Sequence, residues 1–206
     1  MSYFYNRYNI DWNLISEAVK YYTSIGYKYV EVPWIVSSEA IQATFNGTAP
    51  KTKDGLIVGS AEQSFIQMKL DGTFPFLHCG AKLVTVTPCF KNDEIDRIHS
   101  PFFMKVELIN INNNLDDSDV RLQSFIKDAK TFFEMQNVVV DSVKTESGVD
   151  LLIDGIEIGS YGIRSYNSQN RGNFNWVYGT GLAEPRFSIA STGRHYYVDN
   201  DINTGQ

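Results

Sequence analysis

A chain of 206 residues, 43% hydrophobic and 20% charged, is long enough to bury a substantial core, and this composition is typical of a globular protein rather than a disordered one. Its net charge of -6 argues against a general binder of nucleic acid or anionic membranes, because such proteins use a surplus of Lys and Arg to neutralise phosphates. No window approaches the ~20 apolar residues of a membrane span, and the N-terminus lacks the apolar core of a signal peptide. The lack of a repeat or linker predicts one domain over residues 1–206. The lack of a membrane span and of a signal peptide predicts a cytoplasmic location.

The first part of the chain predicts a helix, a strand and two short helices. Apolar residues at helical spacing run from about Asp11 to Ile25, and Gly26 follows as a stop. The segment "YKYVEVPWIV" is typical of a strand, but Pro33 cannot donate to a ladder, so this strand should lie at an edge or against another subunit. Short helices are expected at Ser38 to Phe45 and at Ala61 to Leu70.

The remainder predicts mostly strands. "AKLVTVTPCF" and "FFMKVELINI" precede an amphipathic helix from Ser118 to about Met135, which should cover one face of a sheet. "NVVVDSVKT" and "GVDLLIDGIEIGSYGIRSY" follow, with Asp154-Gly155 as a two-residue hairpin turn, and a last helix begins at about Glu184. Because strands mostly follow one another directly, the pattern favours an α+β fold with a mainly antiparallel sheet flanked by helices.

Charges of both signs are concentrated in "CFKNDEIDRIHSPFFMKVELI", between two of the predicted strands. Alternation places Lys91 and Asp93 on one face of the first strand, and Phe103, Lys105 and Glu107 on one face of the next. If the strands pair, that surface offers a ring to stack on a base and a cation to meet phosphate. The alternative is a solvated hairpin tip with Phe103 in the core.

Two acids lie close together in the predicted hairpin "DLLIDGIEIGSYGIR". With its two-residue turn, Leu152 faces Glu157, so Asp150 lies on the same side as Glu157 and diagonal to it. Mg²⁺ held by these two carboxylates and completed by substrate phosphates fits this arrangement. Arg164 could bind a carboxylate bidentately. Solvated acids on a surface hairpin are the alternative.

The third pattern is "YGTGLAEPRFSIA", in which Gly179 and Gly181 lead through Pro185 into a helix with Arg186 at its start. A helix N-terminus favours anions, and an arginine there can hold a phosphate. Glycines before a helix also occur for purely conformational reasons.

Together and in this order, the segments resemble the catalytic core of class II aminoacyl-tRNA synthetases. "GYKYVEVPWI" resembles the first motif, an edge strand whose central proline, here Pro33, builds the dimer interface. "FKNDEIDRIHSPFFMKVEL" is similar to the second motif of the lysyl, aspartyl and asparaginyl branch, which has Phe-Arg-Asn-Glu, a loop, and His-Asn-Pro-Glu-Phe with a closing Glu-Leu. The resemblance implies that Lys91 holds the α-phosphate and that Phe103 stacks on adenine.

The same motif implies nucleotide contacts for Asp93, His99 and Glu107. Three positions depart from it: Lys91 replaces an arginine, Asp93 replaces a glutamate, and Ile98 stands where the loop has an arginine. Lysine keeps the positive charge but cannot make the bidentate contact that arginine makes with a phosphate.

"DLLIDGIEIGSYGIR" resembles the aspartyl enzymes and, in its ending, ammonia-dependent asparagine synthetase. This implies that Asp150 and Glu157 bind Mg²⁺ and that Arg164, with Tyr161 nearby, binds the substrate.

"GTGLAEPRFSIA" is similar to the third motif in its seryl variant, which implies that Arg186 holds the γ-phosphate and that Gly179 and Gly181 approach ATP. "SAEQ" lies where family members meet the substrate amino group, which implies this role for Glu62.

The resemblance implies an AMP-forming ligase that activates a small amino acid with ATP and Mg²⁺, releases pyrophosphate and forms a homodimer. If Arg164 acts as its family counterpart does, the amino acid is acidic, such as aspartate. We expect an acceptor other than tRNA, because the chain leaves no room for an anticodon-binding domain and its acidic balance offers no tRNA surface. The alternative is a catalytically weak or inactive paralogue that binds a ligand as a regulatory or accessory subunit.

Overall fold

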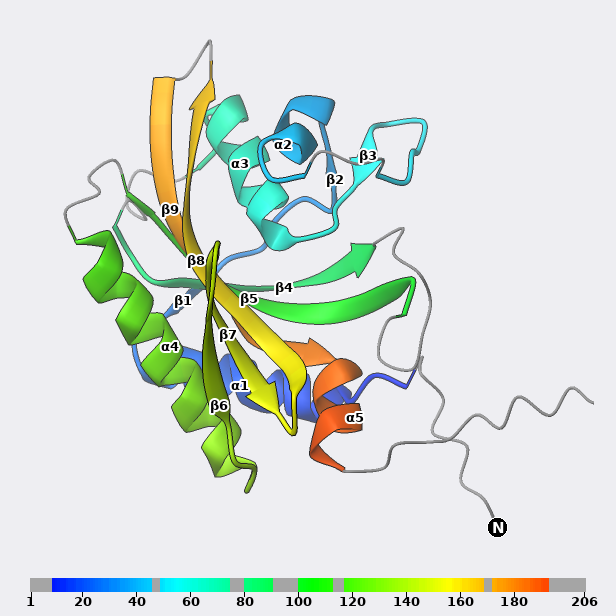
Figure 1. Ribbon diagram of the computed structural model, residues 1–206. Helices are drawn as coiled ribbons and strands as arrows, with labels where there is room; N and C mark the ends of the chain where they lie inside the picture. Colours follow the sequence, from blue (N-terminus) through cyan, green and yellow to red (C-terminus); the bar gives the residue numbers. More distant parts are fainter. Residues whose placement is uncertain are drawn as a thin grey trace, which may run out of the picture.

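The structure, a computed structural model, describes residues 9–45, 49–74, 80–90, 100–112, 117–168 and 172–192. Its centre is a seven-stranded sheet with helices on both faces (Figure 1). The helices are α1 (Trp12–Ser24), α2 (Ser38–Gln42), α3 (Ala61–Asp71), α4 (Ser118–Met135) and α5 (Arg186–Ser191). The strands are β1 (Lys28–Tyr29), β2 (Ile35–Val36), β3 (Leu56–Ile57), β4 (Leu83–Phe90), β5 (Phe102–Asn112), β6 (Asp141–Thr145), β7 (Gly148–Ile153), β8 (Ile156–Ser168) and β9 (Gly172–Glu184).

The large sheet has the strand order β1-β4-β5-β9-β8-β7-β6, and β2 pairs with β3 in a separate small sheet. Every neighbouring pair in the large sheet is antiparallel except β1 and β4, which run parallel. The predicted α+β class with a mainly antiparallel sheet is therefore confirmed.

The strand expected around Pro33 is broken in two. β1 pairs with β4 at one edge of the large sheet, whereas β2 belongs to the small sheet, and Pro33 lies in the segment between them. The predicted edge position is confirmed, but the predicted continuous strand is wrong. A residue without a backbone N–H cannot extend a ladder, so the strand ends before it.

Helices α1 and α4 cover one face of the sheet, and α4 has the bounds that its apolar stripe predicts. The Asp11 side chain accepts a hydrogen bond from the Leu14 amide at 3.0 Å and so caps α1, while Gly26, with φ of 99°, follows its end. Both helix boundaries follow from capping chemistry. No helix within the described ranges is long and apolar enough to cross a membrane.

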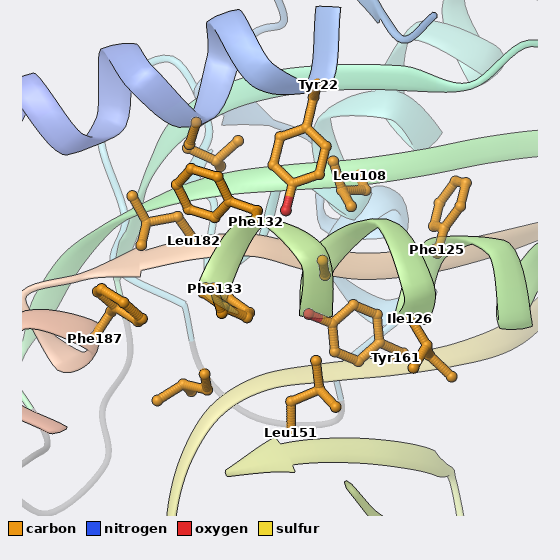
Figure 2. Packing of buried hydrophobic residues seen from close by; sticks show 14 of the residues in the cluster. Tyr22, Leu108, Phe125, Ile126, Phe132, Phe133, Leu151, Tyr161, Leu182 and Phe187 are labelled. Carbon is orange, nitrogen blue, oxygen red and sulfur yellow. The ribbon is translucent and has the colours of Figure 1, made fainter. Parts of the chain in front are cut away.

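Aromatic side chains fill the core between this helix layer and the sheet (Figure 2). Its fully buried members include Tyr22, Phe125, Phe132, Phe133 and Tyr161. Helices α2 and α3 pack on the opposite face over a second core, which includes Phe65, Ile109 and Trp176. Strand β9 contributes to both cores by alternation, so it is buried on both faces.

The predicted hairpin between β7 and β8 is confirmed. Asp154 and Gly155 both have positive φ, at 49° and 81°, as a two-residue type I′ turn requires. Leu152 lies opposite Glu157 as expected, and a register shift next to this pair places Leu151 opposite Gly159.

Strand β9 was not predicted from the sequence, although it lies at the centre of the sheet between β5 and β8. Its glycines make close packing possible: a Cβ on Gly179 would lie 2.6 Å from the Tyr161 ring, and one on Gly181 would lie 2.8 Å from the Tyr22 ring. The two glycines expected in a turn before the last helix therefore lie inside a strand and face the core.

A buried carboxylate joins the end of β9 to the starts of α1 and α5. Glu184 accepts hydrogen bonds from the Ser188 amide at 3.1 Å, from the Ser188 hydroxyl at 2.7 Å and from the Asp11 amide at 3.4 Å. Burial raises the pKa of the Glu184 carboxyl from 4.5 to about 7, although the hydrogen bonds from Ser188 and Asp11 oppose the shift.

We therefore expect the folded state to bind the Glu184 proton more tightly than the unfolded state does. The contribution of this carboxyl to stability is greatest below pH ~4.5 and declines by about 3 kcal/mol as the pH rises to ~7. Unfolding free energies of the wild type and of Glu184→Gln, measured by denaturant titration from pH 4.5 to 8, test this. The wild type should lose stability relative to the variant as the pH rises, and a constant difference would contradict the assignment.

Candidate functional site

A cavity of about 330 Å³ lies on the sheet face that carries α3, at the N-terminal end of that helix. Residues from several elements line it, because alternation along β5, β8 and β9 turns every second side chain toward this face. Five of the predicted site residues line the cavity: Glu62, Phe103, Glu157, Arg164 and Arg186. The structure thus brings together residues that lie up to 124 positions apart.

An ion pair between α3 and β8 lies in the cavity wall. Arg164 Nη1 lies 3.1 Å from each carboxylate oxygen of Glu62. Trp176 on β9 donates its indole N–H to Glu62 Oε2 at 2.7 Å. The Glu62 side chain is only 4% exposed, so its charge is compensated almost entirely by these protein donors.

Aromatic packing fixes the other side of the Arg164 guanidinium. Its carbon lies 4.5 Å from the centroid of the Tyr178 ring, within the range of a cation–π contact. Arg164 pairs with Trp176 across β8 and β9, and Tyr178 follows two residues later on the same face. The register of β8 and β9 therefore positions the Tyr178 ring against the guanidinium and Trp176 next to its partner Glu62.

A second buried ion pair lies beside the first. Lys105 Nζ lies 2.8 Å from Glu107 Oε1, and both side chains come from β5, two residues apart. Glu107 Oε2 accepts hydrogen bonds from the Ser60 hydroxyl at 3.0 Å and from the Ala61 amide at 3.1 Å. Glu107 thus places a negative charge at the N-terminus of α3, where the helix dipole favours one.

These buried charges shift one another's pKa values. Burial and the nearby Glu107 raise the pKa of the Glu62 carboxyl, although Arg164, Lys105 and the Trp176 indole act in the opposite direction. Burial lowers the pKa of the Lys105 ammonium, but Glu107, Cys89 and Glu62 together outweigh this, and the pKa of Lys105 lies above its usual value. Lys105 is therefore a permanent cation.

The other end of the cavity carries a more exposed ion pair. Arg186, the first residue of α5, places Nη1 3.3 Å from Glu157 Oε1, and the Glu157 side chain is 46% exposed. The guanidinium carbon of Arg186 also lies 5.9 Å from the centroid of the Phe103 ring. An aromatic ring and an arginine thus lie side by side, so that the ring could stack on a base while the arginine binds a phosphate.

The predicted metal ligands occupy one face of the hairpin. Leu152 lies opposite Glu157, and Asp150 shares its face by alternation along β7. Within the described ranges, no group of three or more His, Cys, Asp or Glu side chains could hold a metal, and Asp150 is absent from the cavity lining. Two carboxylates with phosphate oxygens still form a suitable donor set for Mg²⁺.

Several predicted site residues lie elsewhere. Tyr161 is buried in the core under α4 (Figure 2), and its hydroxyl donates to the Thr180 carbonyl oxygen, so it does not face the cavity. Gly179 and Gly181 face the same core. Glu107 lies beneath the cavity wall rather than in it. Alternation along β8 and β9 accounts for Tyr161 and the two glycines, whereas Glu107 shares the face of Lys105 but is covered by its contacts with Ser60 and Ala61.

Lys91, Asp93 and His99 lie outside the described residues, as does Ile98. Their expected contacts with the nucleotide stay predictions.

Sequence reasoning did not assign roles to Trp176, Tyr178 or Ser60, which hold Glu62, Arg164 and Glu107 in place. Trp176 and Tyr178 alternate on β9 and could have been found if that strand had been recognised. Ser60 is the N-cap of α3, which a Ser-Ala-Glu start signals. Lys105 was noticed as part of an alternating face but was not assigned to the site.

No known family model matches the sequence, and no curated protein is significantly similar to it. Solved structures do resemble it. Pyrrolysyl-tRNA synthetase from Desulfitobacterium hafniense has a TM-score of 0.65 at 14% identity, and the match covers 88% of this chain and 69% of that one.

Seryl-tRNA synthetase from Pyrococcus horikoshii, in a complex with ATP, has a TM-score of 0.67 at 17% identity, and the match covers 87% of this chain. The serine-tRNA ligase from Naegleria fowleri, in a complex with AMP, has a TM-score of 0.63 at 14% identity over 86% of this chain. The chain spans about half the length of each of these two enzymes, 49% and 52%.

The fold is that of a class II aminoacyl-tRNA synthetase catalytic domain. At 14–17% identity, the likeness concerns the class II synthetase-like fold alone. The function of the cavity has to be inferred from the residues that line it.

Proposed function

We propose that the protein activates the carboxylate of an amino acid with ATP, forming an aminoacyl-adenylate and pyrophosphate. The observation that carries this proposal is the cavity itself, which brings a carboxylate–guanidinium pair at one end together with an aromatic ring and an arginine at the other. The first end suits the charged groups of an amino acid, and the second suits adenine and phosphate.

The proposed reaction is an in-line displacement at the α-phosphorus. A substrate carboxylate oxygen attacks the α-phosphorus, the bond to the bridging oxygen breaks, and pyrophosphate leaves. The protein contributes chiefly by positioning and by charge neutralisation. Phe103 stacks on adenine, Arg186 holds the terminal phosphates, Glu62 meets the substrate ammonium, and Lys91 neutralises the α-phosphate.

Glu157 and Asp150 are the residues that would hold Mg²⁺, because carboxylates are its preferred protein ligands. When bound, the ion supplies positive charge against the phosphates. In the protein alone, Glu157 instead pairs with Arg186, and its 46% exposure lets that pair open when a phosphate chain arrives.

The alternative is a weak or inactive paralogue that binds a nucleotide as an accessory subunit. Lys91 and Asp93 favour it, because they replace the arginine and the glutamate of the motif they resemble. Such a protein would bind ATP through Phe103 and Arg186 without producing an adenylate.

A homodimer is proposed through the edge around Pro33. Large apolar side chains are exposed on both sides of this proline: Tyr29 is 42% exposed, Trp34 50% and Ile35 41%. Exposed aromatic residues at a sheet edge are typical of an interface.

Exchange of labelled pyrophosphate into ATP, measured with each of the twenty amino acids, tests the enzymatic proposal. We expect exchange with at least one amino acid, and a loss of about 100-fold in Arg186→Gln, which removes the cation that holds the phosphates, and in Glu157→Gln, which removes a ligand of the Mg²⁺ that would neutralise them.

Glu134→Gln is the matched control for Glu157→Gln, because Glu134 is exposed on α4, on the opposite face of the sheet. It should leave the exchange rate unchanged. ATP binding without exchange with any amino acid would overturn the enzymatic proposal and support the accessory subunit.

The dimer is tested by light scattering after size-exclusion chromatography. We expect the wild type to have twice the mass of one chain, and Trp34→Glu to shift it to the mass of one chain by placing a charge in the interface. A wild type that is monomeric at micromolar concentration would contradict the proposed interface.

A further inference from the structure

The described part of the cavity wall has three cationic side chains, and each faces a carboxylate of the protein. The pairs are Arg164 with Glu62, Lys105 with Glu107, and Arg186 with Glu157. The charges of these residues therefore balance without a ligand. A substrate that adds a charge here must either separate one of these pairs or accept a like charge beside it.

The pairs differ in how readily they can separate. The side chains of Glu62 and Glu107 are 4% and 0% exposed, so loss of the cation would leave a buried carboxylate uncompensated, which is strongly destabilising. The Glu157 side chain is 46% exposed, so water or another cation can replace Arg186. Of the three pairs, only Arg186–Glu157 is exposed enough for a ligand to replace one of its two members.

Arg164 is held by several contacts at once, although its side chain is 36% exposed. Its Nη1 lies 3.1 Å from both oxygens of Glu62, its guanidinium lies over the Tyr178 ring, and Trp176 holds the carboxylate from the far side. Moving Arg164 toward a new carboxylate would break its contacts with both Glu62 oxygens and with the Tyr178 ring. Arg164 therefore serves first as the counter-charge of Glu62.

We infer that the amino acid taken by this cavity is small and has an uncharged side chain, an inference that rests on the proposed function. A substrate side-chain carboxylate on Arg164 would lie next to Glu62, so two carboxylates would share one guanidinium. A side-chain ammonium would find no unpaired carboxylate among the described residues here, because Glu62 is already paired with Arg164. A neutral side chain adds no charge and leaves the ion pair intact.

The size and the polarity of the cavity agree with this inference. Its volume of about 330 Å³ within the described residues lies at the lower end of the range for ligand pockets, which favours a small amino acid. Ser160, Thr180 and Gln63 also line it and carry no charge, and the Gln63 amide and the Thr180 hydroxyl are already hydrogen-bonded within the protein. This replaces the expectation of aspartate, which took Arg164 to be free for the substrate.

Pyrophosphate exchange with small neutral amino acids (glycine, alanine, serine, threonine) and with charged ones (aspartate, glutamate, lysine) tests the inference directly. We expect the best neutral amino acid to exceed every charged one by at least about tenfold in kcat/KM. A charged amino acid as the best substrate would overturn the inference while leaving the proposed function in place. Absence of exchange with all twenty would overturn the proposed function, and the inference with it.

The variant Glu62→Gln tests the reason for the discrimination. It removes the counter-charge of Arg164 while keeping a side chain of the same shape, so kcat/KM for aspartate, divided by that for the best neutral amino acid, should rise about tenfold. Glu134→Gln, the same change on an exposed position, should leave this ratio unchanged. An unchanged ratio in a variant that melts cooperatively would overturn the inference. If the variant does not fold, the wild-type comparison still decides the outcome.

Discussion

The ion pair between Glu62 and Arg164 is the contact on which the cavity depends. It joins α3 to β8, and the indole N–H of Trp176 adds β9, so three elements from distant parts of the chain meet at one buried carboxylate. Taking that carboxylate out of water is costly unless its charge is matched and its oxygens are hydrogen-bonded. The same two residues therefore hold the helix layer to the sheet and set the charge that a ligand meets.

Close packing on the other face of the sheet makes this arrangement possible. Gly179 and Gly181 let the rings of Tyr161 and Tyr22 lie directly against β9, and the two tyrosine hydroxyls donate to β9 carbonyl oxygens. Tyr22 from α1 and Tyr161 from the neighbouring strand β8 thereby hold β9 on this face. Trp176 and Tyr178 lie on the opposite face of the same strand, where they contact Glu62 and Arg164. Strand β9 therefore contributes to both the core and the site.

Much of the fold could be predicted from the sequence, because local patterns determine it. The apolar stripe fixed the bounds of α4, and the Asp154-Gly155 pair predicted the hairpin and its register. The central strand β9 could not be predicted in this way, because its asparagines and glycines lack the pattern of a strand and owe their conformation to pairing on both sides. The five cavity residues were recognised through the resemblance to known motifs, whereas the partners of Glu62 depend on contacts between distant elements. Charge balance is therefore visible only in three dimensions.

A crystal structure of the protein with a non-hydrolysable ATP analogue and Mg²⁺ is the most direct test of the central claim, that this cavity is a nucleotide and amino-acid site built around an unbroken Glu62–Arg164 pair. The account predicts adenine against the Phe103 ring, the phosphate chain at Arg186 in place of Glu157, and the Glu62–Arg164 contact unchanged. A nucleotide bound elsewhere, or an arginine drawn away from Glu62 onto the phosphates, would contradict it.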